Sequence, residues 1–190
     1  MSQAHAYQPI QEDEYLAQEE TARVRHELVD GEIYAMAGAS ERHNRIAGNV
    51  FFHLRAATRG KTCRAFMADM KLRQAAGTLY YYPDVMLVCD PDDDHPLYKQ
   101  SPCLIAEVLS PATAKIDLRE KLSAYRALTS LRYYLIVDAE RLWAKCYSKD
   151  ASGQWFEQEL SAEDRLQINC GDAQTSLTLD DIYEDTGLLP

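Results

Sequence analysis

Hydrophobic positions along this chain recur with the periods of helices and strands, and the N-terminal third contains both. Residues 11–22 predict a short acidic helix. Alternating apolar residues then flank Asp30-Gly31, and an Asp-Gly pair between such runs is a strong type I′ hairpin signal. Ser40 caps a further predicted helix that runs to about Thr58. The apolar stripe of that helix is Ile46, Val50, Phe51 and Leu54.

The remaining two thirds of the chain consist mostly of short strand-like runs bounded by polar or Pro-rich turns. These runs predict strands near 63–67, 69–74, 80–89, 103–109, 132–138, 142–148, 154–160 and 166–169. A helix is predicted after Pro111, another near 180–184, and a polar loop at 90–101. This order favours an α/β fold in which a mixed central β-sheet is flanked by helices. We expect one domain over residues 1–190, with 1–22 as an N-terminal helical extension.

Two of these apolar strands each carry one carboxylate. Asp84 opens the run YYPDVMLVCD, and Glu107 lies in the middle of PCLIAEVLS. Both segments are apolar on both faces, as central strands of a covered sheet are. An ionised carboxylate in such a place needs a cation, hydrogen bonds or a raised pKa. If the strands are neighbours, Asp84 and Glu107 point into one pocket, and hard divalent cations such as Mg²⁺ prefer such oxygen ligands.

Each of these residues also has an ordinary structural explanation. A Pro-Asp pair commonly opens a turn or strand, and a glutamate among apolar residues can pair with an arginine or lie at a sheet edge. The joint occurrence of Asp84 and Glu107 in successive strands favours the metal-site hypothesis. Lys121 is a third candidate, because it lies on the flank of the apolar stripe of the next predicted helix. Its ammonium could reach a phosphate or the attacking water, although a lone lysine there more often snorkels over the core.

The charge of the chain is negative overall but unevenly distributed. The formal net charge is −10 at pH 7, which argues against a general nucleic-acid-binding surface. Residues 42–73 differ, because eight basic residues stand there against Asp69 alone, a balance of 8 − 1 = +7. A second basic group near the proposed site is Lys115, Arg119, Lys121, Arg126 and Arg132. This distribution fits a protein that presents one face to phosphates, and it equally fits an ordinary solvated surface.

Cysteine usage and hydropathy bear on the compartment. The five cysteines are odd in number and none forms a C-x-x-C pair, so we expect free, mostly buried thiols and neither a zinc site nor a disulfide framework. No run approaches the ~20 apolar residues that span a bilayer. The N-terminus lacks the basic and apolar regions of a secretory signal. We therefore expect a protein of the reducing cytoplasm with no membrane partner.

At these residues the chain resembles the Uma-two family of restriction endonucleases, within the PD-(D/E)XK nuclease superfamily. The resemblance covers about residues 25–183 and is carried by HELVDGEIYAM, YYPDVMLV, RYYLIVD and, most specifically, AEVLSPATAKIDLREKLSAY. It implies a restriction-endonuclease-like core in which Asp84 and Glu107 ligate Mg²⁺ or Mn²⁺. The superfamily has a lysine two positions after the glutamate, where this chain has Leu109. The resemblance therefore maps the lysine onto Lys121.

The same resemblance also concerns Glu27, His43 and the oligomeric state. Glu27, in the hairpin, matches a position that supplies an additional carboxylate. That Glu27 is an ordinary surface residue of the hairpin is an equally good explanation. His43 could approach the pocket from the long helix, where a structural histidine is the more common case. By analogy with nucleases whose single site cuts one strand, a homodimer is expected.

Three functions remain open at this point. The leading hypothesis is a metal-dependent endonuclease that hydrolyses phosphodiester bonds, with DNA as its partner, Asp84 and Glu107 holding the ion, and Lys121 orienting water or stabilising charge. The second is an inactive nuclease fold that serves as a binding module, which the overall acidity and Leu109 permit. The third is a metalloenzyme that acts on a small phosphodiester and needs no groove for DNA.

Overall fold

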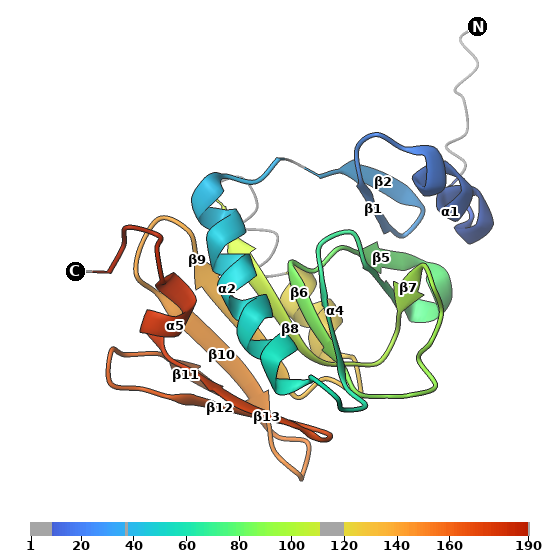
Figure 1. Cartoon of the computed structure of the whole chain (residues 1–190). Helices are drawn as coiled ribbons and strands as arrows, with labels where there is room; N and C mark the ends of the chain where they lie inside the picture. Colours follow the sequence, from blue (N-terminus) through green and yellow to red (C-terminus); the bar gives the residue numbers. More distant parts are fainter. Residues whose placement is uncertain (1–8, 37, 111–119, 190) are drawn as a thin grey trace, which may run out of the picture.

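The computed structural model of the chain describes residues 9–36, 38–110 and 120–189, and its centre is a six-stranded mixed sheet (Figure 1). The strands are β3 (Arg64–Met67), β6 (Val85–Val88), β8 (Pro102–Leu109), β9 (Tyr133–Asp138), β10 (Ala144–Lys149) and β11 (Trp155–Glu159). Their order is β11-β10-β9-β8-β6-β3, with β8 and β9 parallel and the other neighbours antiparallel. All residues of β8 are buried, which explains why this segment is apolar on both faces.

One face of the central sheet is covered by two helices and a hairpin. These elements are α2 (Glu41–Ala57), α5 (Leu179–Tyr183), β12 (Leu166–Cys170) and β13 (Ala173–Leu177). The predicted stripe of α2 packs on this face, with Ile46, Val50 and Leu54 fully buried. The helix begins where Ser40 accepts a hydrogen bond from the backbone amide of His43 at 3.2 Å. This cap places the first turn of α2 near the start of β6.

The other face is covered by a short helix and a second, five-stranded sheet. The helix is α4 (Leu122–Arg126), and the strands are β1 (His26–Val29), β2 (Glu32–Ala35), β4 (Lys71–Gln74), β5 (Leu79–Tyr81) and β7 (Tyr98–Lys99), with the short helix η1 (Ala75–Gly77) between β4 and β5. Their order is β2-β1-β5-β4-β7. The helix α1 (Glu12–Thr21) packs on this smaller sheet through Tyr15, which contacts Leu28 and Tyr80. Among the described residues, none of the helices has the length and apolar character needed to cross a bilayer.

The predicted fold class is confirmed: the protein is α/β, with a mixed central sheet between layers that contain helices. The predicted hairpin is also confirmed, because Asp30 and Gly31 have the positive φ values, 49° and 87°, that a type I′ turn requires. Residues 90–101 contain the short strand β7, and β13 follows β12 without having been predicted. The start of the helix predicted after Pro111 lies outside the described residues.

The prediction of one continuous strand at 80–89 is wrong. The chain breaks after Tyr81, so that β5 belongs to the smaller sheet and β6 to the central one. Pro83 lies in the break, and a proline has no amide hydrogen to donate to a strand ladder. Asp84 consequently lies where the chain passes from one sheet to the other.

The prediction of free cysteines is wrong for four of the five. Disulfides join Cys63 to Cys89 and Cys103 to Cys170, while Cys146 is free and buried. These pairs depend on contacts that sequence spacing does not reveal, since 26 and 67 residues separate their members. The expectation of a reducing compartment depended on free thiols, and these four cysteines do not support it.

Candidate functional site

Asp84 and Glu107 lie beside each other at the junction of the two sheets. β6 and β8 are antiparallel neighbours with Val85 opposite Ala106, so the next pair along the ladder is Asp84 and Glu107. The backbone amide of Asp84 lies 3.5 Å from Oε2 of Glu107, and Oδ2 of Asp84 accepts a hydrogen bond from the Val108 amide at 2.8 Å. The neighbouring strands expected from the sequence are thus present, and they bring the two carboxylates side by side.

Lys121 joins Glu107 to a carboxylate from the smaller sheet. Its Nζ lies 3.4 Å from Oε1 of Glu107 and 2.9 Å from Oε1 of Glu27. Lys121 directly precedes α4, and its side chain is only 8% exposed, so the ammonium is held inside the site rather than in solvent. Glu27 also accepts a hydrogen bond from the Tyr82 amide at 3.2 Å. The structure therefore brings Glu27 and Lys121 to Glu107, with Glu27 inside the site rather than on the outer surface of the hairpin.

His43 completes the contacts of Asp84. Its Nε2 lies 3.3 Å from Oδ2 of Asp84, and the two side chains are 14% and 15% exposed. The residue belongs to the first turn of α2, which the Ser40 cap fixes. His43 and the Val108 amide both contact Oδ2 of Asp84, so together they orient this carboxylate.

Tyr125 is a site residue that the sequence reasoning did not select. Its hydroxyl donates a hydrogen bond to Oε1 of Glu107 at 2.7 Å, and its side chain is fully buried. Burial, together with the charge of Glu107, holds the pKa of Tyr125 well above its ordinary value. The hydroxyl therefore stays protonated and serves as a donor. The available signal was its spacing, since Tyr125 follows Lys121 by four residues and lies on the same side of a helix.

The described residues of the site contain more carboxylates than ammonium groups. Glu27, Asp84 and Glu107 contribute three carboxylates against the one ammonium of Lys121, a formal balance of −3 + 1 = −2 for these four residues. Within the described residues, Oδ1 of Asp84 receives no hydrogen bond, so it is available as a ligand. This donor set suits a divalent cation of the hard class.

The arrangement is a partial coordination site. In the described ranges no three Asp, Glu, His or Cys side chains are disposed to hold an ion by themselves. Mg²⁺ commonly takes one or two carboxylates and completes its octahedral shell with waters and substrate phosphate. Asp84 and Glu107 therefore fit Mg²⁺ or Mn²⁺ better than they fit a metal that demands a full set of protein ligands.

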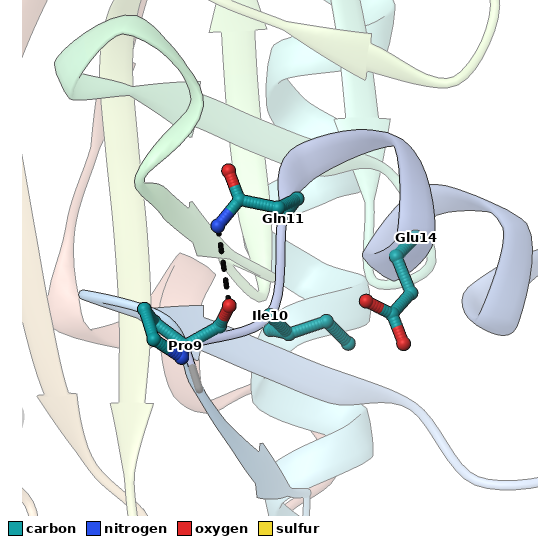
Figure 2. Close-up of a pocket in the computed structure, with 4 residues that line it drawn as sticks. All are labelled: Pro9, Ile10, Gln11 and Glu14. Atoms are coloured by element: carbon teal, nitrogen blue, oxygen red, sulfur yellow. Dashed lines mark hydrogen bonds between the residues drawn. The ribbon is translucent and has the colours of Figure 1, made fainter. Parts of the chain in front are cut away.

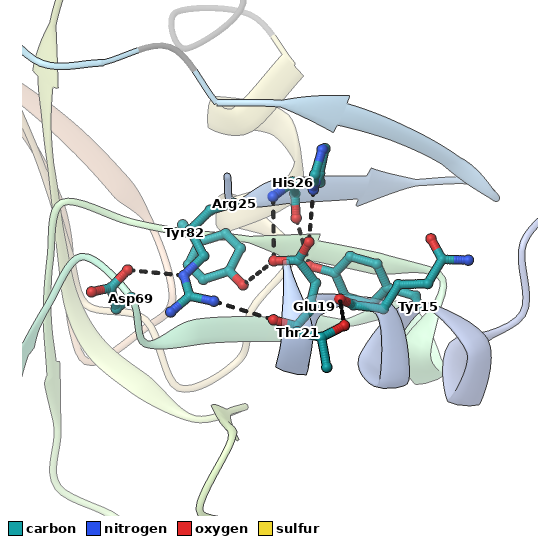
Figure 3. Close-up of polar contacts among 8 residues, drawn as sticks. Tyr15, Glu19, Thr21, Arg25, His26, Asp69 and Tyr82 are labelled. Atoms are coloured by element: carbon teal, nitrogen blue, oxygen red, sulfur yellow. Dashed lines mark hydrogen bonds and ion pairs between the residues drawn. The ribbon is translucent and has the colours of Figure 1, made fainter. Parts of the chain in front are cut away.

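A polar network centred on Glu19 holds His26, the residue before Glu27, and the side chain of Tyr82 (Figure 3). At its centre Glu19, from α1, accepts hydrogen bonds from the Tyr82 hydroxyl at 2.6 Å and from the backbone amide of His26 at 3.3 Å, and lies 2.8 Å from Nδ1 of His26. Burial alone would raise the pKa of Glu19, but the hydrogen bonds from Tyr82 and His26 lower it below its ordinary value. His26 precedes Glu27 and the Tyr82 amide binds Glu27, so this network supports the carboxylate that contacts Lys121.

The basic segment 42–73 does not form one phosphate-facing surface. Arg42 pairs with Glu140, and other members of the segment are engaged elsewhere: Arg45 with Glu41, Arg64 with backbone carbonyls of the 90–93 turn, Arg73 with Glu12, and Lys71 buried against the ring of Tyr82. The exposed cations Arg55 and Arg59 lie at the end of α2. Five of the eight cations of the segment are therefore engaged by carboxylates, backbone carbonyls or a ring of the chain itself.

Comparisons with known proteins agree with this architecture. The model of the Uma2 family, described as "Putative restriction endonuclease", matches residues 12–180. Two Synechocystis proteins of strain PCC 6803, each described as an uncharacterized protein, are similar to the chain. The first, sll1609, is 36% identical over 153 residues, which is 79% of this chain and 86% of that protein. The second, slr1290, is 34% identical over 157 residues, 82% of this chain and 83% of that protein.

A solved structure shares the fold at low sequence identity. It is the crystal structure of a "putative nuclease belonging to DUF820" from Anabaena variabilis, with a TM-score of 0.73 and 14% identity. The similarity covers 92% of this chain and 98% of that one. The family model covers most of the chain and the two relatives exceed 30% identity over most of their length. The chain therefore belongs to the Uma2 family, the family described as restriction endonucleases.

Proposed function

We propose that the protein is a metal-dependent endonuclease that hydrolyses phosphodiester bonds of DNA, with Asp84 and Glu107 as the ligands of Mg²⁺ or Mn²⁺. The observation that carries the proposal is the convergence of these two carboxylates with Lys121 at the junction of the two sheets. Membership of the Uma2 family supports the reaction class. The formal charge of −2 in the site supports a divalent partner.

The residues around the proposed ion divide into ligands and groups that position them. Asp84 and Glu107 offer carboxylate oxygens, and the bound ion would lower the pKa of a water and neutralise charge on the phosphate. His43 and the Val108 amide hold Asp84 through Oδ2. Tyr125 holds Glu107 through Oε1. These contacts fix both carboxylates before substrate arrives, so little reorganisation is needed on binding.

Lys121 acts on the phosphate or on the attacking water. Its ammonium can donate hydrogen bonds and stabilise the negative charge that develops as water attacks phosphorus and the bond to the leaving oxygen breaks. Glu27 lies closer to Lys121 than Glu107 does, 2.9 against 3.4 Å, so we assign to Glu27 the positioning of this ammonium. This assignment differs from the ligand role that the family resemblance suggests for the same position.

A single site of this kind cuts one strand at a time. Cutting both strands of a duplex therefore needs two sites, and we extend the proposal to a homodimer. Sedimentation equilibrium tests this part, with a mass of twice 21.6 kDa expected and a monomer in the presence of DNA as the contrary result.

Plasmid nicking tests the proposed function. Supercoiled DNA is incubated with the parent and with Asp84→Asn, in Mg²⁺, Mn²⁺ or chelator, and Glu163→Gln serves as a control because Glu163 is an exposed carboxylate outside the site. We expect parent and control to nick only with added ion, and Asp84→Asn to lose activity without losing its fold. Equal nicking by Asp84→Asn, or nicking in chelator, would overturn the proposal. If the parent hydrolyses a small diester but not DNA, the proposal that DNA is the substrate would be overturned.

A further inference from the structure

A second hollow with a basic lining lies at the other end of α4 from the proposed site. It has a volume of about 650 Å³ and lies between the end of α4, the start of β9 and the turn that joins β10 to β11. Its lining contains three cations, Arg126, Arg132 and Lys149, together with the ring of Trp155. The acidic chain as a whole disfavours phosphate binding, so a local gathering of cations of this kind is informative.

The three cations have no acidic partner among the described residues. The guanidinium of Arg126 lies over the rings of Trp155 and Tyr147, 5.4 and 5.6 Å from their centroids. Lys149 donates to the carbonyls of Leu128 and Thr129 at 3.3 and 2.9 Å, and its ammonium lies 5.3 Å from the Trp155 centroid. These contacts orient Arg126 and Lys149 and provide no carboxylate to balance their charge.

The positive charges that line the hollow also repel one another. Burial, and next the neighbouring Arg132, lower the pKa of Lys149 below its ordinary value. The backbone of Lys149 is bonded to the carbonyl of Arg132 at 2.8 Å, so the two residues cannot separate without breaking that contact. An anion placed between them would relieve this repulsion.

One carboxylate lines the hollow, but its oxygen is turned toward its own backbone. Oδ1 of Asp150 accepts hydrogen bonds from the amides of Ser152 and Gln154 and from the Ser152 hydroxyl, at 2.7 to 2.9 Å. Asp150 therefore shapes the turn between β10 and β11 and forms no ion pair with the three cations. The lining keeps a formal balance of 3 − 1 = +2.

A hollow beside the start of α1 has the opposite character. It is lined by Pro9, Ile10, Gln11 and Glu14, and Glu14 supplies its one charged group (Figure 2). A phosphate placed there would meet a carboxylate and no cation.

The position of the basic hollow relative to the site suits a polynucleotide. Lys121 precedes α4 in the site, and Arg126 ends the same helix in the hollow. The Arg132 amide is bonded to the Cys103 carbonyl, four residues along β8 from Glu107, so the hollow lies about 13 Å from the carboxylates along the sheet. This distance corresponds to about four base steps of a duplex at an axial rise of 3.4 Å. A chain of nucleotides held at Asp84 and Glu107 can thus place a later phosphate against Arg126, whereas a free phosphate ion gains nothing from this spacing.

We propose that the hollow formed by Arg126, Arg132, Lys149 and Trp155 binds a backbone phosphate of the nucleic-acid substrate and so fixes the strand on one side of the cleavage site. This inference rests on the proposed function for its substrate. Because the hollow lies on only one side of Glu107, the bound DNA strand would run from the cleavage site toward the hollow on that side. Arg126 and Arg132 supply the charge, and Lys149 and Trp155 hold the lining in place.

The test is binding without cleavage, measured by the anisotropy of labelled DNA of about 20 nucleotides in chelator. The variant is Arg126→Gln/Arg132→Gln, and the control is Arg55→Gln/Arg59→Gln, which removes the same charge from exposed positions in the last turn of α2 and just after it. Losing the contact with one phosphate should weaken binding by about tenfold at low salt and reduce the slope of log affinity against log salt by about 0.7–0.9. The control should keep the parent's slope.

Three results would overturn the inference. The first is a site variant that binds like the control, and the second is a parent that does not bind oligonucleotides in chelator. The third is displacement of the oligonucleotide by inorganic phosphate at constant ionic strength, which would identify a site for free anions. Failure of the proposed function is distinguishable, because nicking in Mg²⁺ is scored separately. If the parent binds DNA through Arg126 and Arg132 but does not nick it, the proposed phosphate contact stands and the proposed nuclease activity fails.

Discussion

Replacing Tyr125 by phenylalanine removes one hydroxyl from the centre of the site and leaves the packing in place. The hydroxyl donates at 2.7 Å to Oε1 of Glu107, and the two residues are 0% and 3% exposed. A hydrogen bond to a charged group contributes about 1.5–3 kcal/mol to stability. Phenylalanine keeps the ring, so no cavity term is added. We expect the free energy of unfolding to fall by about 2 kcal/mol, and the melting temperature by about 4–8 °C for a chain of this size.

The assay is urea unfolding followed by circular dichroism, with Tyr81→Phe as the matched control. Tyr81 is also buried and its ring packs edge-on against Tyr125 with centroids 5.6 Å apart, but its hydroxyl has no hydrogen bond to the described residues. Burial raises the pKa of Tyr81 to about 12, so it stays neutral like Tyr125. The control should lose less than about 0.5 kcal/mol, since no buried hydrogen bond is broken.

A double-mutant cycle isolates the contact with Glu107. In a Glu107→Gln background the acceptor has lost its charge, so Tyr125→Phe should cost about 1 kcal/mol less than it does in the parent. The reasoning is refuted if Tyr125→Phe and Tyr81→Phe have equal stability, or if the effect of Tyr125→Phe is the same in both backgrounds.

Three further predictions concern the groups around this contact. Lys121→Met leaves Glu107 without its ammonium neighbour and should destabilise the protein by about 3 kcal/mol at neutral pH. The loss should shrink on acidification, because the carboxylates become protonated. Urea unfolding at two pH values measures this, and an undiminished loss in acid contradicts it. The pKa of Glu19 is lower in the folded protein than its ordinary value near 4.5, so its ionised form stabilises the fold above that pH, and this stability is lost as the pH falls through the folded pKa. Glu19→Gln should therefore flatten the acid side of the profile of melting temperature against pH. A slope equal to the parent's would refute this. Reduction of the Cys103–Cys170 disulfide, which closes 67 residues, should lower stability by about 4 kcal/mol, and melting with and without dithiothreitol checks it, with unchanged melting as the contrary result.

Local patterns were enough to predict most of the elements and the placement of the two carboxylates on neighbouring strands. The runs around Asp84 and Glu107 are apolar on both faces, which predicted two central strands. Strands that follow one another in the sequence are commonly neighbours in a sheet, as β6 and β8 are here. The Asp-Gly turn and the Ser40 cap are likewise decided by two or three residues. The break at Pro83 could have been predicted, because a proline inside a strand-like run argues against a continuous central strand.

Contacts between distant segments were beyond the reach of sequence patterns. Glu27 meets Lys121 because the smaller sheet lies over the central one, an arrangement that no local period encodes. Cys63 and Cys89 meet because Arg64 pairs with Val88, and register of this kind depends on the whole sheet. The role of Tyr125 was hidden for another reason, since an aromatic residue on an apolar helical stripe is ordinarily core.

Calorimetry with Mn²⁺ tests the central claim most directly, because it measures the ion at Asp84 and Glu107 without depending on any substrate. The account predicts binding of one ion per chain at millimolar concentration or below, lost in Glu107→Gln and retained in Glu163→Gln. An absence of binding heat in the parent over the millimolar range, or the same heat in Glu107→Gln, would contradict it.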